Sequence, residues 1–360
     1  MTFLKHNHVS LRQLSYKTLA FLVSLLLVFV LAAPFAPATT VLAENTSSNK
    51  SSVTDEPKLT EATTAIVTDA QGNVLWSKNP DQELPMASIT KVMTAIVALD
   101  SGVNLDEPCK ISVPDLEEGS QVAGLTSDDT PTLRQLIMMM LVYSANDAAY
   151  NIAINVSGSQ QAFVDQMNKK AAEIGMTHTQ FQNPHGLDAD GHYSTARDLA
   201  LMGRYAREHY PLIASAVHTR SYTTTVGGEQ RTFHSTDDLM DSYRGLLGIK
   251  TGAEDSGTAF LGASKRGNIT LYTCVLGCET TQGRFDDTAI LMNWAYRNYN
   301  RIASSELTRL CRFVRARTTS CSLQWLNHQL LPRIWHGLAP KTSPTRPPCF
   351  LPTFQLLTTS

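Results

Sequence analysis

The apolar segment from Pro85 to Leu99 constrains the fold most, because it combines the pattern of a buried helix with a lysine. Its apolar residues recur at the three- and four-residue spacing of a helix. These residues are Ile89, Val92, Met93, Ile96 and Val97. Ser88 and Lys91 are the polar exceptions, and their separation by three positions puts their Cβ atoms about 5–6 Å apart on one helix face. The segment therefore predicts a buried helix that brings an amine beside a hydroxyl.

This pair has two interpretations. Burial disfavours the ammonium form of a lysine, so Lys91 could accept the proton of Ser88. A serine beside a base is the usual arrangement for covalent acyl transfer. Alternatively, Ser88 caps the helix and Lys91 extends from its first turn toward solvent. The same spacing occurs at Ser47 and Lys50 in a polar stretch, so spacing alone does not identify a nucleophile.

The amino-terminal segment has the features of an export signal. Residues 1–43 place basic residues before the apolar run Leu19–Leu31, and Val41–Ala43 supplies small residues for a signal peptidase. An uncleaved anchor is the alternative, and both predict that the remaining chain lies outside the cytoplasm. Residues 44–60 are rich in Ser and Thr and are predicted to be a polar linker. The formal charge of −2 gives no reason to expect nucleic acid as a partner.

The pattern between residues 61 and 300 predicts an α+β domain. Ala65–Lys78 has the pattern of a hairpin near one end. Three further strands are expected near the other end, at 247–251, 258–264 and 269–276. A closing helix is expected at 287–299, with Asp287 as its cap. Strands at both ends of a helical stretch predict an antiparallel sheet flanked by helices.

The helical stretch between the strands contains a polar break. Thr130 is expected to cap one buried helix and Asp147 the next, with Ser144 and Asn146 at the junction between them. These two residues either face a cleft or only cap the break. Two further expectations concern histidines and cysteines. His185 and His192 lack zinc-site spacing, and Cys274 and Cys278 are expected to be buried thiols.

Three short motifs together resemble a known set. Ser88-Ile89-Thr90-Lys91, Ser144-Ala145-Asn146 and Lys250-Thr251-Gly252 are similar, in order and context, to the S-x-x-K, S-x-N and K-T-G motifs of penicillin-binding proteins and serine β-lactamases. Longer stretches resemble the low-molecular-mass D-alanyl-D-alanine carboxypeptidases over about residues 60–300. Those stretches are 143–149, 183–187, 192–200 and 248–252. The resemblance implies a β-lactamase/transpeptidase-like fold with an all-helical subdomain.

The same resemblance implies a serine peptidase that trims peptidoglycan stem peptides and is acylated by β-lactams. Ser88 would attack the carbonyl between the last two D-alanines, and Lys91 would be its base. Ser144 would relay a proton to the leaving amine, and Asn146 would hold the substrate amide. No cofactor or metal is required by this chemistry.

The remaining implied site residues bind the substrate. Lys250, in the motif with Thr251 and Gly252, would keep the site electropositive, and Gly252 would let the substrate backbone lie along the strand edge. The N–H groups of Ser88 and Ala253 would hold the oxyanion. Arg284 would bind the terminal carboxylate through two parallel hydrogen bonds. The alternative for Arg284 is a surface residue paired with Glu279 or Asp286.

Two rival functions have less support from the sequence. A class A-like β-lactamase usually carries Asp where this chain has Ala145, and no loop supplies the glutamate that such enzymes use for deacylation. A noncatalytic penicillin-sensing or wall-binding module is disfavoured because every expected catalytic residue type is present. One departure from the family pattern is His234–Asp238, which replaces an Asn-rich stretch before K-T-G.

The carboxy-terminal tail, residues 301–360, is atypical for such an enzyme. After Glu306 it has no acidic residue, seven Arg and Lys, and three of the six cysteines. We expect disorder or a tail translated in a shifted frame, although Trp325–Leu338 could touch a membrane surface.

Overall fold

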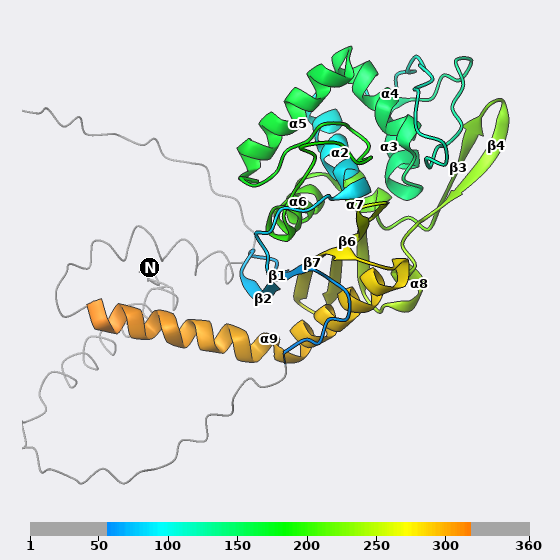
Figure 1. Ribbon diagram of the computed structural model, residues 1–360. Helices are drawn as coiled ribbons and strands as arrows, with labels where there is room; N and C mark the ends of the chain where they lie inside the picture. The colour runs from blue at the N-terminus through cyan, green and yellow to red at the C-terminus, as the bar shows by residue number, and fades with distance from the viewer. Residues whose placement is uncertain (1–55, 318–360) are drawn as a thin grey trace, which may run out of the picture. The chain divides into compact units, whose positions relative to one another are not determined.

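A five-stranded antiparallel sheet organises the part of the chain that the computed structural model describes, residues 56–317 (Figure 1). Its strand order is β2-β1-β7-β6-β5, so strands from both ends of the domain pair in one sheet. The strands are β1 Thr64–Asp69, β2 Val74–Lys78, β5 Leu246–Glu254, β6 Gly257–Arg266 and β7 Ile269–Cys278. The predicted α+β arrangement is confirmed, and the last three strands are longer than expected. The predicted signal peptide, most of the linker and the tail after residue 317 lie outside the described residues.

Helices cover both faces of this sheet. Ile66 packs in a core with the central helices, whereas its neighbours Ala65 and Val67 pack in a second core. This alternation arises because successive strand residues point to opposite faces. Helix α6 (Ala196–His209) contacts the first face, and α9 (Thr281–Arg317) contacts the second. Two covered faces explain why the central strands β1, β7 and β6 are buried along most of their length.

The helical region differs from the prediction at two helix starts. It comprises η1 Ala87–Ile89, α2 Thr90–Asp100, α3 Leu133–Val142, α4 Asn146–Ser157, α5 Gln160–Ile174 and α7 Pro211–Ala216. The cap of α3 is Thr132, not Thr130, because the Thr132 side chain accepts the Gln135 N–H in a capping box. Ala145 is the residue before α4, so the prediction that Asp147 is the cap is wrong.

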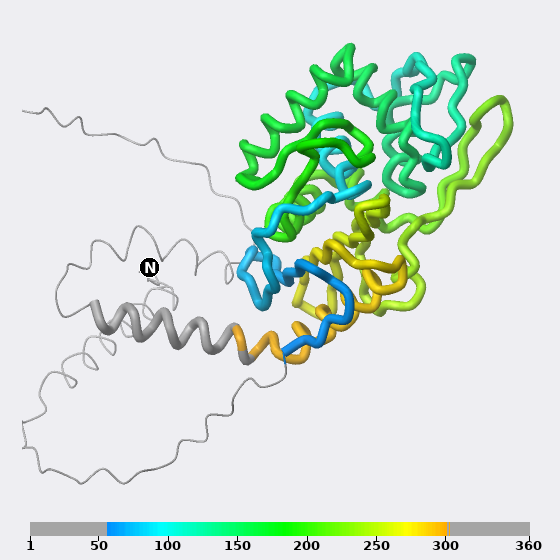
Figure 2. The backbone as a smooth tube through the Cα atoms, viewed as in Figure 1, coloured from blue at the N-terminus to red at the C-terminus, as the bar shows by residue number. Residues whose placement is uncertain are grey.

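A two-stranded hairpin projects from the helical region (Figure 2). It consists of β3 Ser221–Val226 and β4 Glu229–His234, joined at Gly227 and Gly228. Both glycines have positive φ, which suits residues without a Cβ. The short helix α8, Leu239–Ser242, follows the hairpin and was not predicted.

Helix α9 starts six residues before the predicted cap Asp287. The Asp287 carboxylate instead accepts the backbone N–H groups of Thr60, Glu61 and Ala62 at 2.6, 2.9 and 2.7 Å. It therefore fixes the segment before β1 to α9 and does not begin the helix. The helix also continues to Arg317, past the predicted domain end at residue 300.

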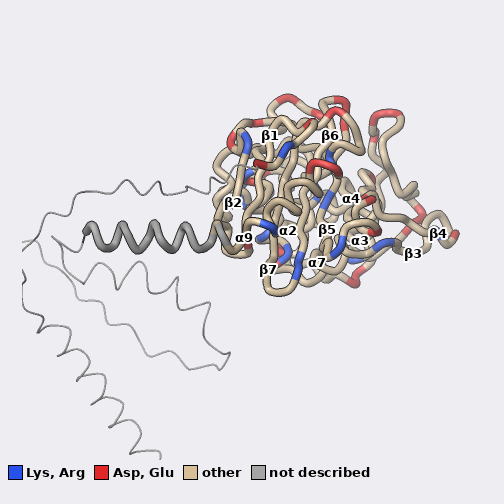
Figure 3. The backbone as a smooth tube through the Cα atoms, turned by 90° about the horizontal axis from the view of Figure 1, so that it is seen from below, with Lys and Arg blue, Asp and Glu red and all other residues tan. Residues whose placement is uncertain are grey.

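Acidic and basic positions are interspersed over the described part of the chain (Figure 3). Within residues 56–317, no helix combines the length and apolar character needed to cross a membrane. Cys274 and Cys278 are buried free thiols, as predicted. Burial raises the pKa of Cys278 to about 12.

Candidate active site

Ser88 and Lys91 meet at the junction of η1 and α2. A 2.6 Å hydrogen bond joins Lys91 Nζ to Ser88 Oγ, and Nζ also donates to the His185 carbonyl oxygen at 2.5 Å. Lys91 is fully buried, and Ser88 makes no side-chain cap. The alternative of a capping serine and a solvent-directed lysine is therefore wrong.

Burial determines the charge state of Lys91. Removal from water lowers its pKa well below the ordinary value, and the nearby Lys250 lowers it further. A neutral amine has a lone pair to accept the Ser88 proton. The two causes are the burial and second cation expected from the sequence.

The loop 183–187 holds this junction in place. Thr94 Oγ1 donates to the Pro184 carbonyl oxygen at 2.6 Å, next to the bond from Lys91 to His185. A Cβ at Gly186 would lie 2.1 Å from the Ala87 carbonyl oxygen, so the loop packs closely against η1. Ala87 itself has a φ of 49°, an uncommon backbone conformation for a residue with a side chain. The role of the His185 backbone was not predicted; only the resemblance of 183–187 to the family singled out this loop.

The junction between α3 and α4 brings Ser144 to Lys250. Lys250 Nζ donates to Ser144 Oγ at 2.9 Å and to the Thr251 carbonyl oxygen at 3.0 Å. Ser144 has a φ of 69°, and neither it nor Asn146 caps α4. Asn146 is 3% exposed, and its Oδ1 has no hydrogen-bond partner. The interpretation that these residues only cap the break is therefore wrong.

Lys250 is buried as deeply as Lys91. Burial and the Arg284 guanidinium lower its pKa to about 7, while Asp237 acts in the opposite direction. Thr251 Oγ1 is 2.6 Å from Thr236 Oγ1. Thr236 belongs to His234–Asp238, the stretch that departs from the family pattern. Lys91 and Lys250 thus both have a lowered pKa. Lys91 is hydrogen-bonded to the Ser88 hydroxyl and Lys250 to the Ser144 hydroxyl.

Strand β5 is an edge strand and carries the K-T-G motif. An edge strand leaves backbone groups free to pair with an added strand. A Cβ at Gly252 would lie 2.9 Å from the Met86 carbonyl oxygen and 3.0 Å from Ala87 Cβ. The space left by this glycine is therefore taken by Met86 and Ala87, which brings β5 against the residues just before Ser88. Ala253 follows at the exposed side of the strand.

Arg284 lies in the first turns of α9 and not in a loop. It is 5% exposed, and its Nη1 donates to the Gly252 carbonyl oxygen at 2.6 Å. Its Nε is buried without a partner. Arg284 is therefore not a surface residue paired with Glu279 or Asp286. Its hydrogen bond to the Gly252 carbonyl oxygen supports the strand that carries the K-T-G motif.

A cavity of about 350 Å³ opens over Ser88. Asn146 and Ala253 also line it, whereas the other predicted site residues lie outside its lining. The rest of the lining contains five acidic residues: Glu117, Glu118, Asp188, Glu254 and Asp255. Burial raises the pKa of Glu254 to about 7, although Lys91 opposes this shift. No sequence pattern marked these acids, because they come from three separate segments.

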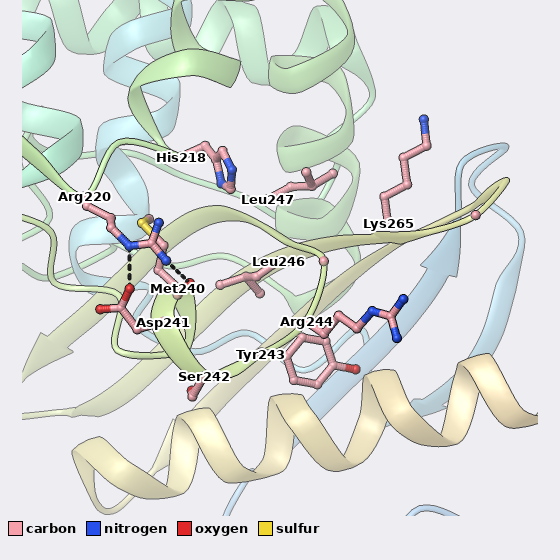
Figure 4. Close-up of a pocket in the computed structure, with 12 residues that line it drawn as sticks. His218, Arg220, Met240, Asp241, Ser242, Tyr243, Arg244, Leu246, Leu247 and Lys265 are labelled. Carbon is pink, nitrogen blue, oxygen red and sulfur yellow. Dashed lines mark hydrogen bonds and ion pairs between the residues drawn. The ribbon is translucent and has the colours of Figure 1, made fainter.

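A larger cavity of about 700 Å³ lies at the start of β5 (Figure 4). Arg220 forms an ion pair with Asp241 beside it and donates to the Met240 carbonyl oxygen at 3.0 Å. None of the predicted site residues lines this cavity. Three of the predicted site residues, Ser88, Asn146 and Ala253, line the smaller cavity instead.

Comparisons with known proteins agree on one group of enzymes. A family model described as D-alanyl-D-alanine carboxypeptidase matches residues 50–280. The D-alanyl-D-alanine carboxypeptidase DacF of Bacillus subtilis is 29% identical over 77% of this chain and 71% of its own length. DacC of Escherichia coli is 32% identical over 65% of this chain, which spans 60% of that relative.

Solved structures give the same result. Penicillin-binding protein D2 from Listeria monocytogenes, in its cefotaxime-bound form, is 32% identical with a TM-score of 0.62. The similarity covers 67% of this chain and all of that one. The Streptomyces K15 DD-transpeptidase is 27% identical with a TM-score of 0.62, over 68% of this chain and 99% of its own.

Proposed function

Because this chain belongs to the D-alanyl-D-alanine carboxypeptidase family, we propose that it removes the terminal D-alanine from peptidoglycan stem peptides through an acyl-enzyme on Ser88. The observation that carries this proposal is the 2.6 Å bond between Ser88 Oγ and the fully buried Lys91 Nζ. A hydroxyl beside an amine whose pKa is well below its ordinary value is an activated nucleophile.

Acylation begins when Lys91 accepts the Ser88 proton. Ser88 Oγ then bonds to the carbonyl carbon of the penultimate D-alanine, and the N–H groups of Ser88 and Ala253 stabilise the oxyanion. Ser144, held by Lys250 at 2.9 Å, relays the proton from Lys91 to the leaving amine, so that Lys91 is neutral again. The amide bond breaks, and the terminal D-alanine leaves as a free amino acid.

Deacylation reverses the roles of the same groups. A water molecule loses a proton to Lys91 and adds to the ester carbonyl, and the ester bond to Ser88 Oγ breaks. The proton returns to Oγ, so the enzyme is restored and the shortened peptide leaves with a new carboxylate. Asn146 Oδ1, which has no partner in the structure, accepts an N–H of the substrate during both steps.

The terminal carboxylate binds at the Lys250–Thr251 end of β5. Lys250 and the buried Arg284 supply positive potential there, and the substrate backbone pairs with the free edge of β5. Arg284 Nη1 is used by the Gly252 carbonyl oxygen, so its remaining N–H groups are the ones available to a ligand.

The enzyme acts outside the cytoplasm, after export by the predicted signal in residues 1–43. Two observations support β-lactams as covalent inhibitors: the motif set around Ser88 and the cefotaxime-bound relative. A strained lactam carries a carbonyl that Ser88 Oγ can attack in place of the D-Ala-D-Ala amide.

Intact mass spectrometry tests the proposal directly. Residues 44–360 are mixed with penicillin and, separately, with an N-acylated D-Ala-D-Ala peptide. We expect one penicillin adduct that maps to Ser88, and release of D-alanine from the peptide. Ser88→Ala and Lys91→Ala should abolish both, while Ser242→Ala, an exposed serine elsewhere, should change neither. An undiminished adduct in Ser88→Ala would disprove the assignment of the nucleophile.

A further inference from the structure

A pair of threonine hydroxyls links the strand of the K-T-G motif to the segment between β4 and α8. Thr236 Oγ1 lies 2.6 Å from Thr251 Oγ1. Resting on the proposed function, we propose that Thr236 is a positioning residue for substrate binding. Its hydroxyl donates to the Thr251 oxygen, which leaves the Thr251 proton for the terminal carboxylate of the substrate.

Thr251 lies on the side of β5 that faces the substrate. It is 4% exposed and stands two positions before Ala253, which lines the cavity over Ser88. Residues two apart on a strand point to the same face of it. The Thr251 side chain therefore shares the face that Ala253 presents to the cavity, at the end of β5 where the proposed function places the carboxylate.

The two hydroxyls have one proton more than their mutual hydrogen bond uses. Among the described residues, neither oxygen has another hydrogen-bond partner, and each hydroxyl has one donor and two acceptor lone pairs. If Thr251 donates to Thr236, it has no proton left for a ligand. If Thr236 donates to Thr251, the Thr251 proton stays free. A carboxylate only accepts hydrogen bonds, so its arrival favours the second arrangement.

The neighbouring cations do not replace this donor. Lys250 Nζ already donates to Ser144 Oγ, and Arg284 Nη1 donates to the Gly252 carbonyl oxygen. These two groups supply positive charge, whereas the Thr251 hydroxyl supplies a donor from the strand itself. A hydroxyl that accepts one hydrogen bond donates the next one more strongly, so a chain of two hydrogen bonds holds a carboxylate better than one.

The segment that carries Thr236 is held at both ends before any substrate binds. At its start, the Ser235 N–H donates to the Arg220 carbonyl oxygen at 2.8 Å, next to the paired strands β3 and β4. At its end, the Leu239 N–H donates to Asp237 Oδ1 at 3.0 Å. The donor is thus already in place, so little conformational freedom is lost when the carboxylate arrives.

The variant Thr236→Val tests the proposal, because it keeps the size of the side chain and removes the hydroxyl. Its substrates are an N-acylated peptide that ends in D-Ala-D-Ala and the same peptide with a carboxy-terminal amide. We expect kcat/KM for the carboxylate peptide to fall about three- to tenfold, the effect of losing one hydrogen bond. The amide is neutral and gains less from a polarised donor, so its kcat/KM should change by less than about twofold.

Three further variants separate this role from simple packing. Thr236→Ser restores the hydroxyl and should restore the preference for the carboxylate. In a Thr251→Val background, Thr236→Val should cause no further loss, because Thr236 acts through Thr251. The matched control is Thr232→Val, which breaks a similar exposed pair with Thr223 at 2.8 Å on the hairpin and should change neither substrate. Formation of the Ser88 adduct with excess penicillin checks each site, and Thr236→Ala replaces Thr236→Val if that variant forms none.

The outcomes distinguish this proposal from the proposed function. No fall in Thr236→Val, equal falls for the carboxylate and amide peptides, or a full further loss in the Thr251→Val background would overturn the positioning role and leave the carboxypeptidase activity established. Failure of the unmodified enzyme to release D-alanine from the carboxylate peptide would overturn the proposed function, and the role of Thr236 with it.

Discussion

Lys250 and Arg284, at the proposed carboxylate-binding end of the substrate cleft, are almost fully buried, whereas the carboxylates at the other proposed end are mostly exposed to solvent. The cationic end is held by short hydrogen bonds to Ser144 and to the Gly252 carbonyl oxygen. The acidic rim at the other end, which comprises Glu117, Glu118, Asp188, Glu254 and Asp255, has only the tie between Asp188 and Ser256. Buried charges interact strongly and are little screened, while exposed pairs contribute at most about 1 kcal/mol.

This difference indicates that the two ends have different roles in substrate binding. A free carboxylate is common to every D-Ala-D-Ala terminus, so a rigid and buried binding site suits it. The side chain before that terminus differs between stem peptides, and weak exposed contacts can adjust to it. The predictions below test whether the two ends behave so differently.

Replacing Lys250 should have the largest effect. Lys250→Gln removes the cation that lowers the pKa of Lys91 and the donor that holds Ser144. We expect kcat/KM to fall by about 10²–10³, as is usual for loss of a proton-transfer group. The remaining activity should need a higher pH, because the pKa of Lys91 rises toward its ordinary value and less of it is neutral. An unchanged acid limb in the pH profile of penicillin acylation would contradict this role.

Arg284→Ala should weaken turnover of peptides with a free terminal carboxylate by roughly 2–4 kcal/mol, through loss of a charge-assisted interaction. Hydrolysis of an amidated analogue and acylation by penicillin should fall much less. Arg134→Ala, which breaks an exposed ion pair with Asp106, is the control and should leave both unchanged. Equal losses on carboxylate and amidated substrates would mean that Arg284 only supports Gly252 and β5.

Asp237 should make the cationic end sensitive to pH. Burial raises the pKa of Asp237 to about 7, and its Oδ2 is buried without a partner. Below pH 7 the group is neutral, whereas above pH 7 its negative charge opposes the substrate carboxylate near Lys250 and Arg284. We therefore expect KM to rise a few-fold from pH 6 to pH 8.

The variant Asp237→Asn keeps the shape of this side chain and removes its titration, so the rise in KM should become smaller, and the part due to Lys250, whose pKa is also about 7, should remain. Asp238→Asn serves as the control, because Asp238 is the exposed neighbour of Asp237 in the chain. A KM that rises equally in Asp237→Asn would exclude Asp237 as the source of the pH dependence.

The smallest expected effect is a difference in salt dependence between the two ends of the substrate cleft. Raising the ionic strength from about 0.05 M to 0.5 M shortens the screening length to a few ångströms. The change in KM that Glu254→Gln/Asp255→Asn causes at the acidic rim should then become about two- to threefold smaller. The preference for a free carboxylate over an amide should change little, since Lys250 and Arg284 are buried. Equal salt dependence at both ends would contradict the comparison.

The sequence predicted the features that depend on neighbours along the chain. Helical spacing located the helix of Ser88 and Lys91, and the strand pattern of residues 65–78 located the hairpin of β1 and β2. The order of three short motifs indicated the family, and strands at both ends of a helical stretch predicted the α+β fold. Each single helix, strand or motif is contained within a few consecutive residues, which is why one sequence reveals it.

Only the tertiary structure determined the contacts between distant segments. The His185 carbonyl oxygen reaches Lys91 across 94 positions, and Asp287 binds Thr60 across 227. A carboxylate can cap its own helix or accept the backbone N–H groups of a distant segment. Asp287 was expected to cap a helix, but in the folded chain it accepts N–H groups of residues 60–62. Arg284 was expected in a loop, but α9 begins before it and buries it against Gly252. The acidic rim joins three segments that share no local pattern. Such contacts depend on packing and on which charges are removed from water, and neither quantity is encoded in residue spacing.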